Sequence, residues 1–342
     1  MIAGQGTVNF YIAKSHDTCM ISSDHRIAFG PVPSRRLGQS LGINNVPTKF
    51  CSYSCVYCQI GQTTEKAIRP RPFFAPEQIY DAVAARLYKV RAGGQRVDYL
   101  SFVPDGEPTL DSRLGDSIDA LRDLGLPIAV ITNASLLSRD DVRSRLGKAD
   151  LVSVKVDTID DAIWRKVNLP HRELDLATIL QGIRDFAAGY TGTLITDTML
   201  IAGLNDTRES LSATADFLAG IAPQTSYLAV PTRPTTVKGV HGTDEAGLLR
   251  AHQIFSARPA NVELLTGHEV GQFAHTGDAR EDLLAITAVH PMREDDVRRL
   301  LAEDQADWQL IESLLAAGEL KPLIYDGERF YLRPVRRGRH GV

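Results

Sequence analysis

Cysteine is scarce in this chain of 342 residues, which contains four. The chain also lacks an apolar run of the ~20 residues that a membrane-spanning helix needs, and its start lacks the basic residues and apolar core of a secretion signal. We therefore expect a cytoplasmic protein with no membrane association, and paired structural disulfides are rare in that compartment. The formal net charge of −4 gives no general excess of positive charge for binding nucleic acid. Any such binding would have to be local.

The order of apolar runs and helical patterns predicts an α/β fold. From about residue 37 the two alternate, which is typical of β-α units around a mainly parallel sheet. Six strands with five helices between them fit a partial barrel, and a flat doubly wound sheet is the competing architecture. The predicted strands span 38–46, 96–103, 127–132, 150–156, 193–201 and 224–230, and the predicted helices lie near 76–91, 111–124, 138–147, 175–188 and 207–219.

The C-terminal region has a different pattern. Three helical segments end at Gly318, and two apolar strands then flank Asp326-Gly327, a strong hairpin signal. Three helices followed by a hairpin are typical of a winged-helix module. The predicted organisation is an irregular N-terminal extension (1–28), a core barrel (29–237), a connector with a helix near 243–257 (238–275), and a winged-helix-like domain with the basic tail "RPVRRGRH" (276–342).

Three of the four cysteines lie within the stretch "FCSYSCVYCQIG", as Cys51, Cys55 and Cys58. A structural zinc site normally needs four protein ligands, and the fourth would have to be His171 or Cys19, brought in through space. A cubane iron–sulfur cluster with one iron free of protein sulfur fits three thiolates better. The open iron could then bind a substrate or a cofactor.

The spacing C-x3-C-x2-C, with Tyr57 before the last cysteine, resembles the motif of the radical S-adenosylmethionine (SAM) superfamily. The resemblance implies one [4Fe–4S] cluster on the three cysteines, with the amino and carboxylate groups of SAM on the open iron. It further implies that reduction cleaves SAM to a 5′-deoxyadenosyl radical, which takes a hydrogen atom from the substrate. The resemblance also implies a partial (βα)6 barrel and an external one-electron donor of the flavodoxin or ferredoxin type.

The run "FVPDGEPTLD" resembles the Gly-Gly-Glu segment that binds the cofactor's amino group in this superfamily. Gly106 and Glu107 match, and Asp105 replaces the first glycine. A glycine lets the backbone approach a ligand closely, and a carboxylate suits an ammonium. The alternative is a simple turn, since Asp, Gly and Pro are turn formers.

The predicted strand "VSVKVDT" alternates polar residues with valines, a pattern that can be interpreted without any resemblance. Side chains alternate along a strand, so Ser153, Lys155 and Asp157 share one face and the valines between them share the other. The valine face suits the helix layer, and the polar face would line the barrel interior. An unpaired buried ammonium is costly, so Lys155 needs a partner: Asp157, Asp197 or the SAM carboxylate. The alternative is a solvated strand end with a Lys–Asp pair.

Other candidates follow the remaining strands. Asn133 could hydrogen-bond the cofactor or turn the chain, while Ile201 and Gly203 resemble the segment that contacts adenine. Arg233, held between prolines, is a candidate for an anionic group of the substrate at the carboxyl end of a barrel strand, with a surface arginine as the alternative. Lys155, Asp197 and Arg233 are the candidate catalytic group; Arg35 and Arg36 are weaker candidates for the role of Arg233.

Taken together, the motifs "GPVPSRRLGQSLGIN", "GEPTL", "TNASLL", "GLND" and "PTRP" resemble one subgroup, the iron–sulfur oxidoreductases similar to the tRNA wyosine-base synthase. The likeness covers about residues 29 to 236. The wyosine synthase holds a second cluster on three further cysteines, and here one cysteine, Cys19, is left.

We therefore expect a radical SAM enzyme, with tRNA or another nucleic acid as the preferred substrate. The alternatives are modification of a peptide or small metabolite, or a non-catalytic iron–sulfur regulator that binds DNA through the winged helix.

Overall fold

The structure is a computed structural model, and it describes residues 27–63, 65–258, 261–265, 277–289, 291–325 and 327–334. Nearly all of the expected N-terminal extension, Cys19 included, lies outside these ranges, as does the basic tail from residue 335. Within the described ranges, no helix has both the length and the apolar character needed to cross a membrane.

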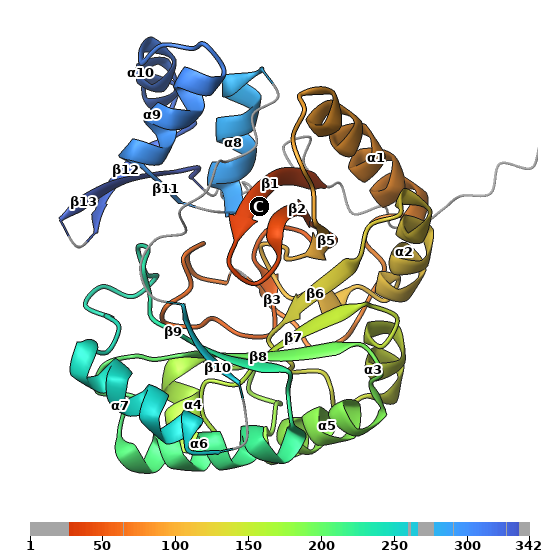
Figure 1. Cartoon of the computed structure of the whole chain (residues 1–342), viewed down its shortest axis with the longest axis vertical. Coiled ribbons are helices and arrows are strands. Elements are labelled where there is room, and N and C mark those ends of the chain that lie inside the picture. The colour runs from red at the N-terminus through yellow and green to blue at the C-terminus, as the bar shows by residue number, and fades with distance from the viewer. Residues whose placement is uncertain are drawn as a thin grey trace, which may run out of the picture.

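Eight strands form one curved sheet in the order β1-β2-β5-β6-β7-β8-β9-β10. The edge strand β1 is antiparallel to β2, and the other neighbours are parallel. Figure 1 shows the sheet curling into a half-barrel, which decides against a flat doubly wound sheet. The strands are β1 (Ala28–Ser34), β2 (Gly38–Ile43), β5 (Tyr99–Phe102), β6 (Ile128–Thr132), β7 (Leu151–Lys155), β8 (Thr193–Met199), β9 (Thr225–Ala229) and β10 (Val262–Leu265).

Helices cover the outer face of this sheet (Figure 1). The first has Pro76 in its first turn and Lys89 and Arg91 in its last, which matches the preference of helix ends for these residues. One short helix, α4, was not expected. The helices are α1 (Pro76–Ala92), α2 (Leu114–Leu121), α3 (Asp140–Leu146), α4 (Asp161–Val167), α5 (Leu176–Gly189), α6 (Arg208–Ile221) and α7 (Glu245–Ser256).

The region expected to be a connector contributes to the barrel. Helix α7 follows β9, and β10 then pairs in parallel with β9. The sheet thus gains one strand after the six that were predicted, and β1 adds another at the opposite edge. The described part of the region therefore completes a sixth β-α-β step of the same sheet.

Alternation along the strands separates two apolar layers. On β7 the side chains of Val152 and Val154 are fully buried in the core between the sheet and the helices. Leu151 belongs instead to a second cluster, together with Leu37 from the turn between β1 and β2. The turn of this hairpin therefore inserts into the concave side of the half-barrel, and the polar residues Ser153 and Lys155 lie on that same side of β7.

The described part of the C-terminal region has its own hydrophobic core. Its three-stranded antiparallel sheet has the order β11-β13-β12, and Gly318 and Gly327 adopt the positive φ that turns favour. The winged-helix assignment stays a prediction. The elements are α8 (Ala279–Val289), β11 (Met292–Arg293), α9 (Glu294–Glu303), α10 (Gln309–Ala316), β12 (Lys321–Tyr325) and β13 (Glu328–Leu332).

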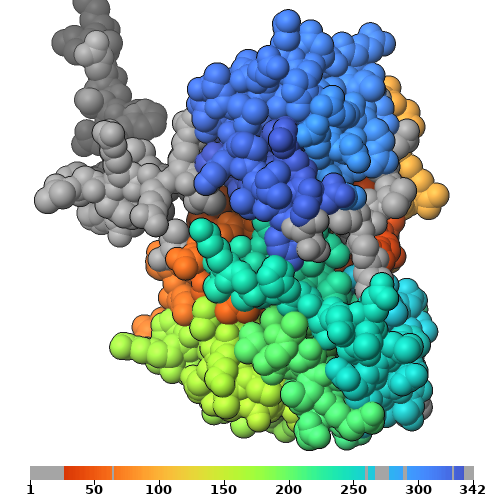
Figure 2. All heavy atoms as spheres, turned by 90° about the vertical axis from the view of Figure 1, so that its left-hand side faces the viewer, coloured from red at the N-terminus to blue at the C-terminus, as the bar shows by residue number. Residues whose placement is uncertain are grey.

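A buried ion pair joins this C-terminal domain to the barrel. Arg86 of α1 contacts Asp282 of α8 at 2.7 Å, with 6% and 0% of their side chains exposed. The same guanidinium donates to the Gly30 carbonyl of β1 at 2.6 Å, and Phe29 and Ala285 form a small apolar cluster beside it. Figure 2 shows the C-terminal domain as a lobe seated against the rest of the molecule.

Candidate active site

The three predicted cysteine ligands lie on one loop at the carboxyl end of β2. Two short strands, β3 (Phe50–Cys51) and β4 (Glu65–Lys66), pair at its base. The amide of Val56 donates to the Val167 carbonyl at 2.9 Å, so the end of α4 holds one side of the loop. The amide of Val237 donates in turn to the Val56 carbonyl at 3.2 Å. The loop is therefore fixed from two directions.

Each cysteine sulfur has a nitrogen donor from a different part of the chain. The amide nitrogen Nδ2 of Asn133 lies 3.5 Å from Sγ of Cys51, and that of Asn168 lies 3.4 Å from Sγ of Cys55. The ammonium nitrogen Nζ of Lys49 lies 3.7 Å from Sγ of Cys58. Donors around sulfur ligands are a usual means of supporting an iron–sulfur cluster.

The electrostatics of the loop disfavour free thiolates. Burial raises the pKa of Cys51 well above its usual value, and the nearby Glu107 adds to the effect. Burial, with Asp157 adding to it, raises the pKa of Cys55 to about 12. Without bound metal these thiols stay protonated at neutral pH, and a cationic metal centre is what turns them into thiolate ligands. The residues present therefore fit a cluster.

A zinc site has less support. The His171 ring accepts a hydrogen bond from the Glu173 amide at 3.2 Å, and Cys19 lies outside the described residues. Among the residues that are described, no three or more His, Cys, Asp or Glu side chains gather as the ligands of a single ion would. A cluster does not require such convergence, because each thiolate binds a different iron.

Gly106 and Glu107 follow β5, and their resemblance to the Gly-Gly-Glu segment predicts that they lie beside the cofactor. A Cβ atom on Gly106 would lie 2.1 Å from the Phe50 carbonyl oxygen, so glycine is required by the close approach of the cysteine loop. The Glu107 carboxylate is buried and accepts hydrogen bonds from the side chains of Thr109 and Thr132 and from the Asn133 amide at 2.8 Å. Burial raises the pKa of Glu107, and these donors oppose the shift.

The polar face of β7 forms an ion network in the half-barrel. Nζ of Lys155 lies 2.8 Å from Asp197 and 3.8 Å from Asp157, so both predicted carboxylate partners are present. Arg36 binds the other oxygen of Asp197 at 2.7 Å. Burial opposes ionisation of Asp197, but the two cations hold its pKa below the usual value. Burial also opposes the charge of Lys155, but Asp197 and Asp157 together raise its pKa.

This network is continuous with the cysteine loop. The Tyr57 hydroxyl donates to Asp157, and Nζ of Lys155 lies 5.1 Å from the centre of the Tyr57 ring. Asn168 donates to Asp157 at 2.7 Å as well as to the Cys55 sulfur. The polar residues of β7 and the cysteines therefore belong to one site.

The remaining candidates are also placed by the structure. Ser153 is buried, and its Oγ has no hydrogen-bond partner among the described residues. Ile201 packs against Tyr57 beside the loop, and Gly203 lies in the turn after β8 with a φ of +71°. Nη1 of Arg233 lies 3.3 Å from Oε1 of Gln59, next to Cys58. Arg36 contacts Asp197, the partner of Lys155, and its role toward a substrate anion stays a prediction.

Three residues of the site were not predicted from the sequence. Lys49 and Asn168 touch the cysteine sulfurs, and Asn205 donates to the carbonyls of Asp157 and Met199, which ties the ends of β7 and β8 together. Lys49 had a signal, since it stands two residues before the first cysteine. No residue pattern marks Asn168, which follows the unpredicted helix α4.

A family model described as the radical SAM superfamily matches residues 45–218. The chain belongs to the radical SAM superfamily. It is an enzyme of this class, with a [4Fe–4S] cluster and SAM as its cofactors. The UPF0026 protein MJ1312 of Methanocaldococcus jannaschii is 44% identical over 312 residues, which are 91% of this chain and 97% of that protein.

Solved structures of radical SAM enzymes share the fold. One is TYW1 with a lysine-pyruvate adduct bound, at a TM-score of 0.53 and 17% identity, covering 70% of this chain and 80% of that one. Another is a radical SAM methyltransferase from Sphaerobacter thermophilus, at a TM-score of 0.51 and 16% identity, covering 66% of each chain. At these identities the likeness is one of fold.

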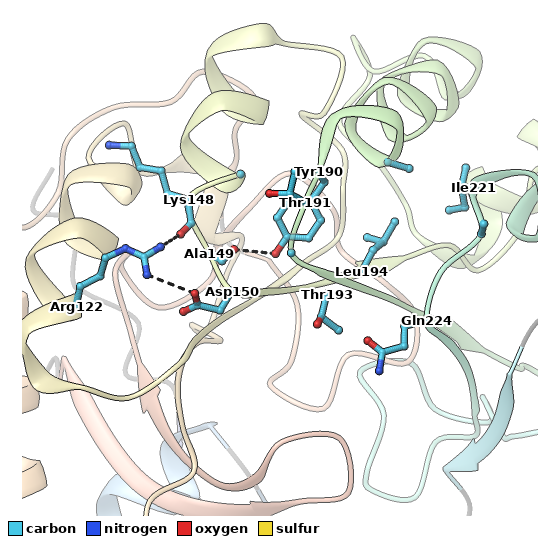
Figure 3. A pocket seen from close by; sticks show the side chains of 14 residues that line it. Arg122, Lys148, Ala149, Asp150, Tyr190, Thr191, Thr193, Leu194, Ile221 and Gln224 are labelled. Carbon is cyan, nitrogen blue, oxygen red and sulfur yellow. Dashed lines mark hydrogen bonds and ion pairs between the residues drawn. The ribbon is translucent and has the colours of Figure 1, made fainter.

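A pocket of about 640 Å³ lies away from the cysteines. Asp150, Thr193 and Gln224 line it where β7, β8 and β9 begin, and Arg122 donates from one wall to Asp150 (Figure 3). It thus opens at the amino ends of the strands, whereas active sites of such barrels form at the carboxyl ends. We place the radical SAM site at the cysteine end.

Proposed function

We propose that this chain binds SAM between the cysteine loop and the carboxyl ends of β5 to β8. Its substrate would lose a hydrogen atom in the space bounded by Lys155, Asp197 and Arg233. The observation that carries the proposal is the continuity of the site. Three cysteine sulfurs, each with a nitrogen donor, connect through Tyr57 and Asp157 to the Lys155–Asp197 pair.

The residues around the loop have distinct roles in this proposal. When bound, the reduced cluster supplies the electron that cleaves SAM to methionine and the 5′-deoxyadenosyl radical. Oε2 of Glu107 accepts from the Asn133 amide and keeps acceptor capacity for the SAM ammonium. Lys155 offers its ammonium to the SAM carboxylate, and the unpartnered Oγ of Ser153 offers a hydrogen bond from the barrel interior. Ile201 supplies an apolar wall for adenine.

The proposal is tested with oxygen-free protein reconstituted with iron and sulfide, then mixed with SAM and dithionite. We expect 5′-deoxyadenosine and methionine in equal amounts. Cys55→Ala should lose both the brown chromophore and this product. An intact cluster that yields no 5′-deoxyadenosine would contradict the proposal and favour a non-catalytic iron–sulfur protein.

For the substrate, we infer tRNA or another nucleic acid as the first class to test, since the motifs resemble the wyosine-synthase subgroup and the fold resembles TYW1. The predicted C-terminal domain, residues 276–342, contains thirteen Asp and Glu against ten Lys and Arg, a formal net charge of −3. Phosphate backbones require positive charge, and four of the ten cations are arginines of the sequence "RPVRRGRH". Any nucleic-acid contact of this domain would therefore be local to that stretch.

Cations beside the cysteine loop are better placed for a phosphate backbone. Lys66 pairs across from Cys51 in the β3–β4 ribbon, and Arg69 follows it; both are exposed. Together with Arg233 they would hold a nucleic acid near the reacting centre. An electron donor of the flavodoxin or ferredoxin type would supply the cluster, and replacing dithionite by reduced flavodoxin tests that part.

A further inference from the structure

Lys49 touches the cysteine loop but has no part in the reaction described so far. Its Nζ lies 2.8 Å from the Gly61 carbonyl oxygen and 3.7 Å from Sγ of Cys58. It therefore bridges Cys58, the last cysteine of the loop, and Gly61, three residues further along the chain. Of the three sulfur donors, Asn133 and Asn168 are neutral amides, and Lys49 is the one that carries a formal charge.

The backbone holds Lys49 in this position. Its φ is +66°, a left-handed conformation that is uncommon outside glycine. Its amide donates to the Asp105 carbonyl at 2.6 Å, which fixes the start of the loop to the end of β5. Such a conformation persists where the surroundings determine it, and it often marks a functional position.

Because Lys49 is buried, its ammonium needs a negative charge close by. The residue is 3% exposed, and a buried ammonium is costly unless negative charge lies close by. The acceptors within hydrogen-bond distance are one carbonyl and one cysteine sulfur. Once Cys58 is a thiolate ligand, the cluster joins the nearby Asp105 carboxyl as a counter-charge of Lys49.

We propose that Lys49 is a positioning residue that raises the reduction potential of the cluster by fixing a buried positive charge against the Cys58 ligand. This inference rests on the proposed function, because it requires that the three cysteines hold the cluster. Reduction transfers one electron from dithionite or a reduced flavodoxin to the cluster; no bond forms or breaks and no proton moves. The cluster gains one negative charge, so the adjacent ammonium stabilises the reduced form more than the oxidised form.

The test is a redox titration of the reconstituted protein, followed by electron paramagnetic resonance, without SAM or substrate. Lys49→Met removes the charge and keeps an unbranched stem, and Lys49→Gln keeps a hydrogen-bond donor without the charge. We expect the equilibrium constant for reduction to fall at least about tenfold in both, a shift of about 59 mV for a one-electron couple. Lys49→Arg, which keeps the charge, should recover most of the shift.

The matched control is Lys166→Met. Lys166 lies in α4, whose end holds the cysteine loop, but it is exposed and should leave the potential unchanged, because solvent screens its charge. Iron and sulfide content and circular dichroism are measured for every variant.

Each unfavourable result has a distinct meaning. An unshifted potential in Lys49→Met or Lys49→Gln with a full cluster would overturn the inference. A folded protein that no longer assembles a cluster in either variant would also overturn it, and would assign Lys49 to cluster assembly. A wild-type protein with a normal cluster but no SAM cleavage would contradict the proposed function and leave this measurement intact.

Discussion

At the scale of single residues, Gly106 does more than permit a turn. The Phe50 carbonyl oxygen lies where its Cβ would be, 2.1 Å away, and the Glu107 amide donates to the same oxygen at 3.0 Å. The residue after Phe50 is the first cysteine. The segment that follows β5 is therefore in direct contact with the start of the cysteine loop.

We expect Gly106→Ala to displace the cysteine loop and lower the iron content after reconstitution. The change should also destabilise the fold by about 1–3 kcal/mol, the usual cost of overpacking. Gly220→Ala is the matched control, because that glycine is helical and has no atom within 4 Å of an added Cβ; it should be neutral or gain up to about 1 kcal/mol. Iron assays and denaturant unfolding measure both, and equal iron content in the two variants would contradict this reading.

Asp105, which replaces a glycine of the superfamily motif, predicts a pH dependence of stability. Burial raises its pKa to about 7, against the partial opposition of Lys49 and Arg333. Below the unfolded-state pKa of about 3.9 the carboxyl is protonated in both states; between that value and about 7 the folded state binds more protons, so stability falls as pH rises.

Asp105→Asn should remove this contribution. The free energy of unfolding of the variant, relative to wild type, should rise by up to about 4 kcal/mol between roughly pH 4 and 7, and then level off. Denaturant unfolding across this range measures the difference. A difference that does not change with pH would show that Asp105 ionises normally.

At the scale of secondary-structure elements, α1 and α8 carry two ion pairs that differ in burial. Arg86 and Asp282 are buried, whereas Lys89 and Glu281 lie 3.6 Å apart with 55% and 33% of their side chains exposed. The first should hold the C-terminal domain to the barrel, and the second should contribute little, because water screens it.

We expect Arg86→Met to cost about 3–5 kcal/mol, since it removes the guanidinium that pairs with the fully buried Asp282 carboxylate. The double variant with Asp282→Leu should recover most of that loss. Lys89→Met, the control on the same two helices, should cost under about 1 kcal/mol. Unfolding free energies measure the series. Similar losses for Arg86→Met and Lys89→Met would contradict the proposed role of the buried pair.

The strands differ in how well they could be predicted from the sequence. The alternation of β7 predicted that Lys155 would face a carboxylate in the barrel, and Asp157 and Asp197 are both there. Strand β1 was missed because "AFGPVPS" contains two prolines, which sheets tolerate mainly at edges, and β1 is an edge strand. Strand β10 has four residues, too few for a pattern to emerge.

At the scale of the whole molecule, the site residues and contacts that the sequence did not predict come from segments that are far apart in the chain. The cysteine spacing identified the loop, but Asn168 reaches it from the end of a helix more than a hundred residues away. Arg36 meets Asp197 because the β1–β2 turn folds into the half-barrel. Such positions depend on sheet closure, which no local pattern encodes.

The charge distribution of the whole molecule predicts how a nucleic acid would bind. The double variant Lys66→Glu with Arg69→Glu should weaken tRNA binding and flatten its salt dependence, by roughly one unit of slope for each cation lost. Arg139→Glu, at an exposed arginine before α3, is the control. Gel shifts at several salt concentrations measure the effect, and unchanged binding in the double variant would rule out the β3–β4 ribbon as the contact.

In the proposed site, the three-cysteine loop would leave one iron of the cluster open for SAM. The most direct measurement is electron–nuclear double resonance on the reduced protein, with SAM isotopically labelled in the amino and carboxylate groups of its methionine part. We expect hyperfine coupling of both labels to the cluster. A fully reduced cluster that shows no coupling to either label, with SAM in excess, would contradict it.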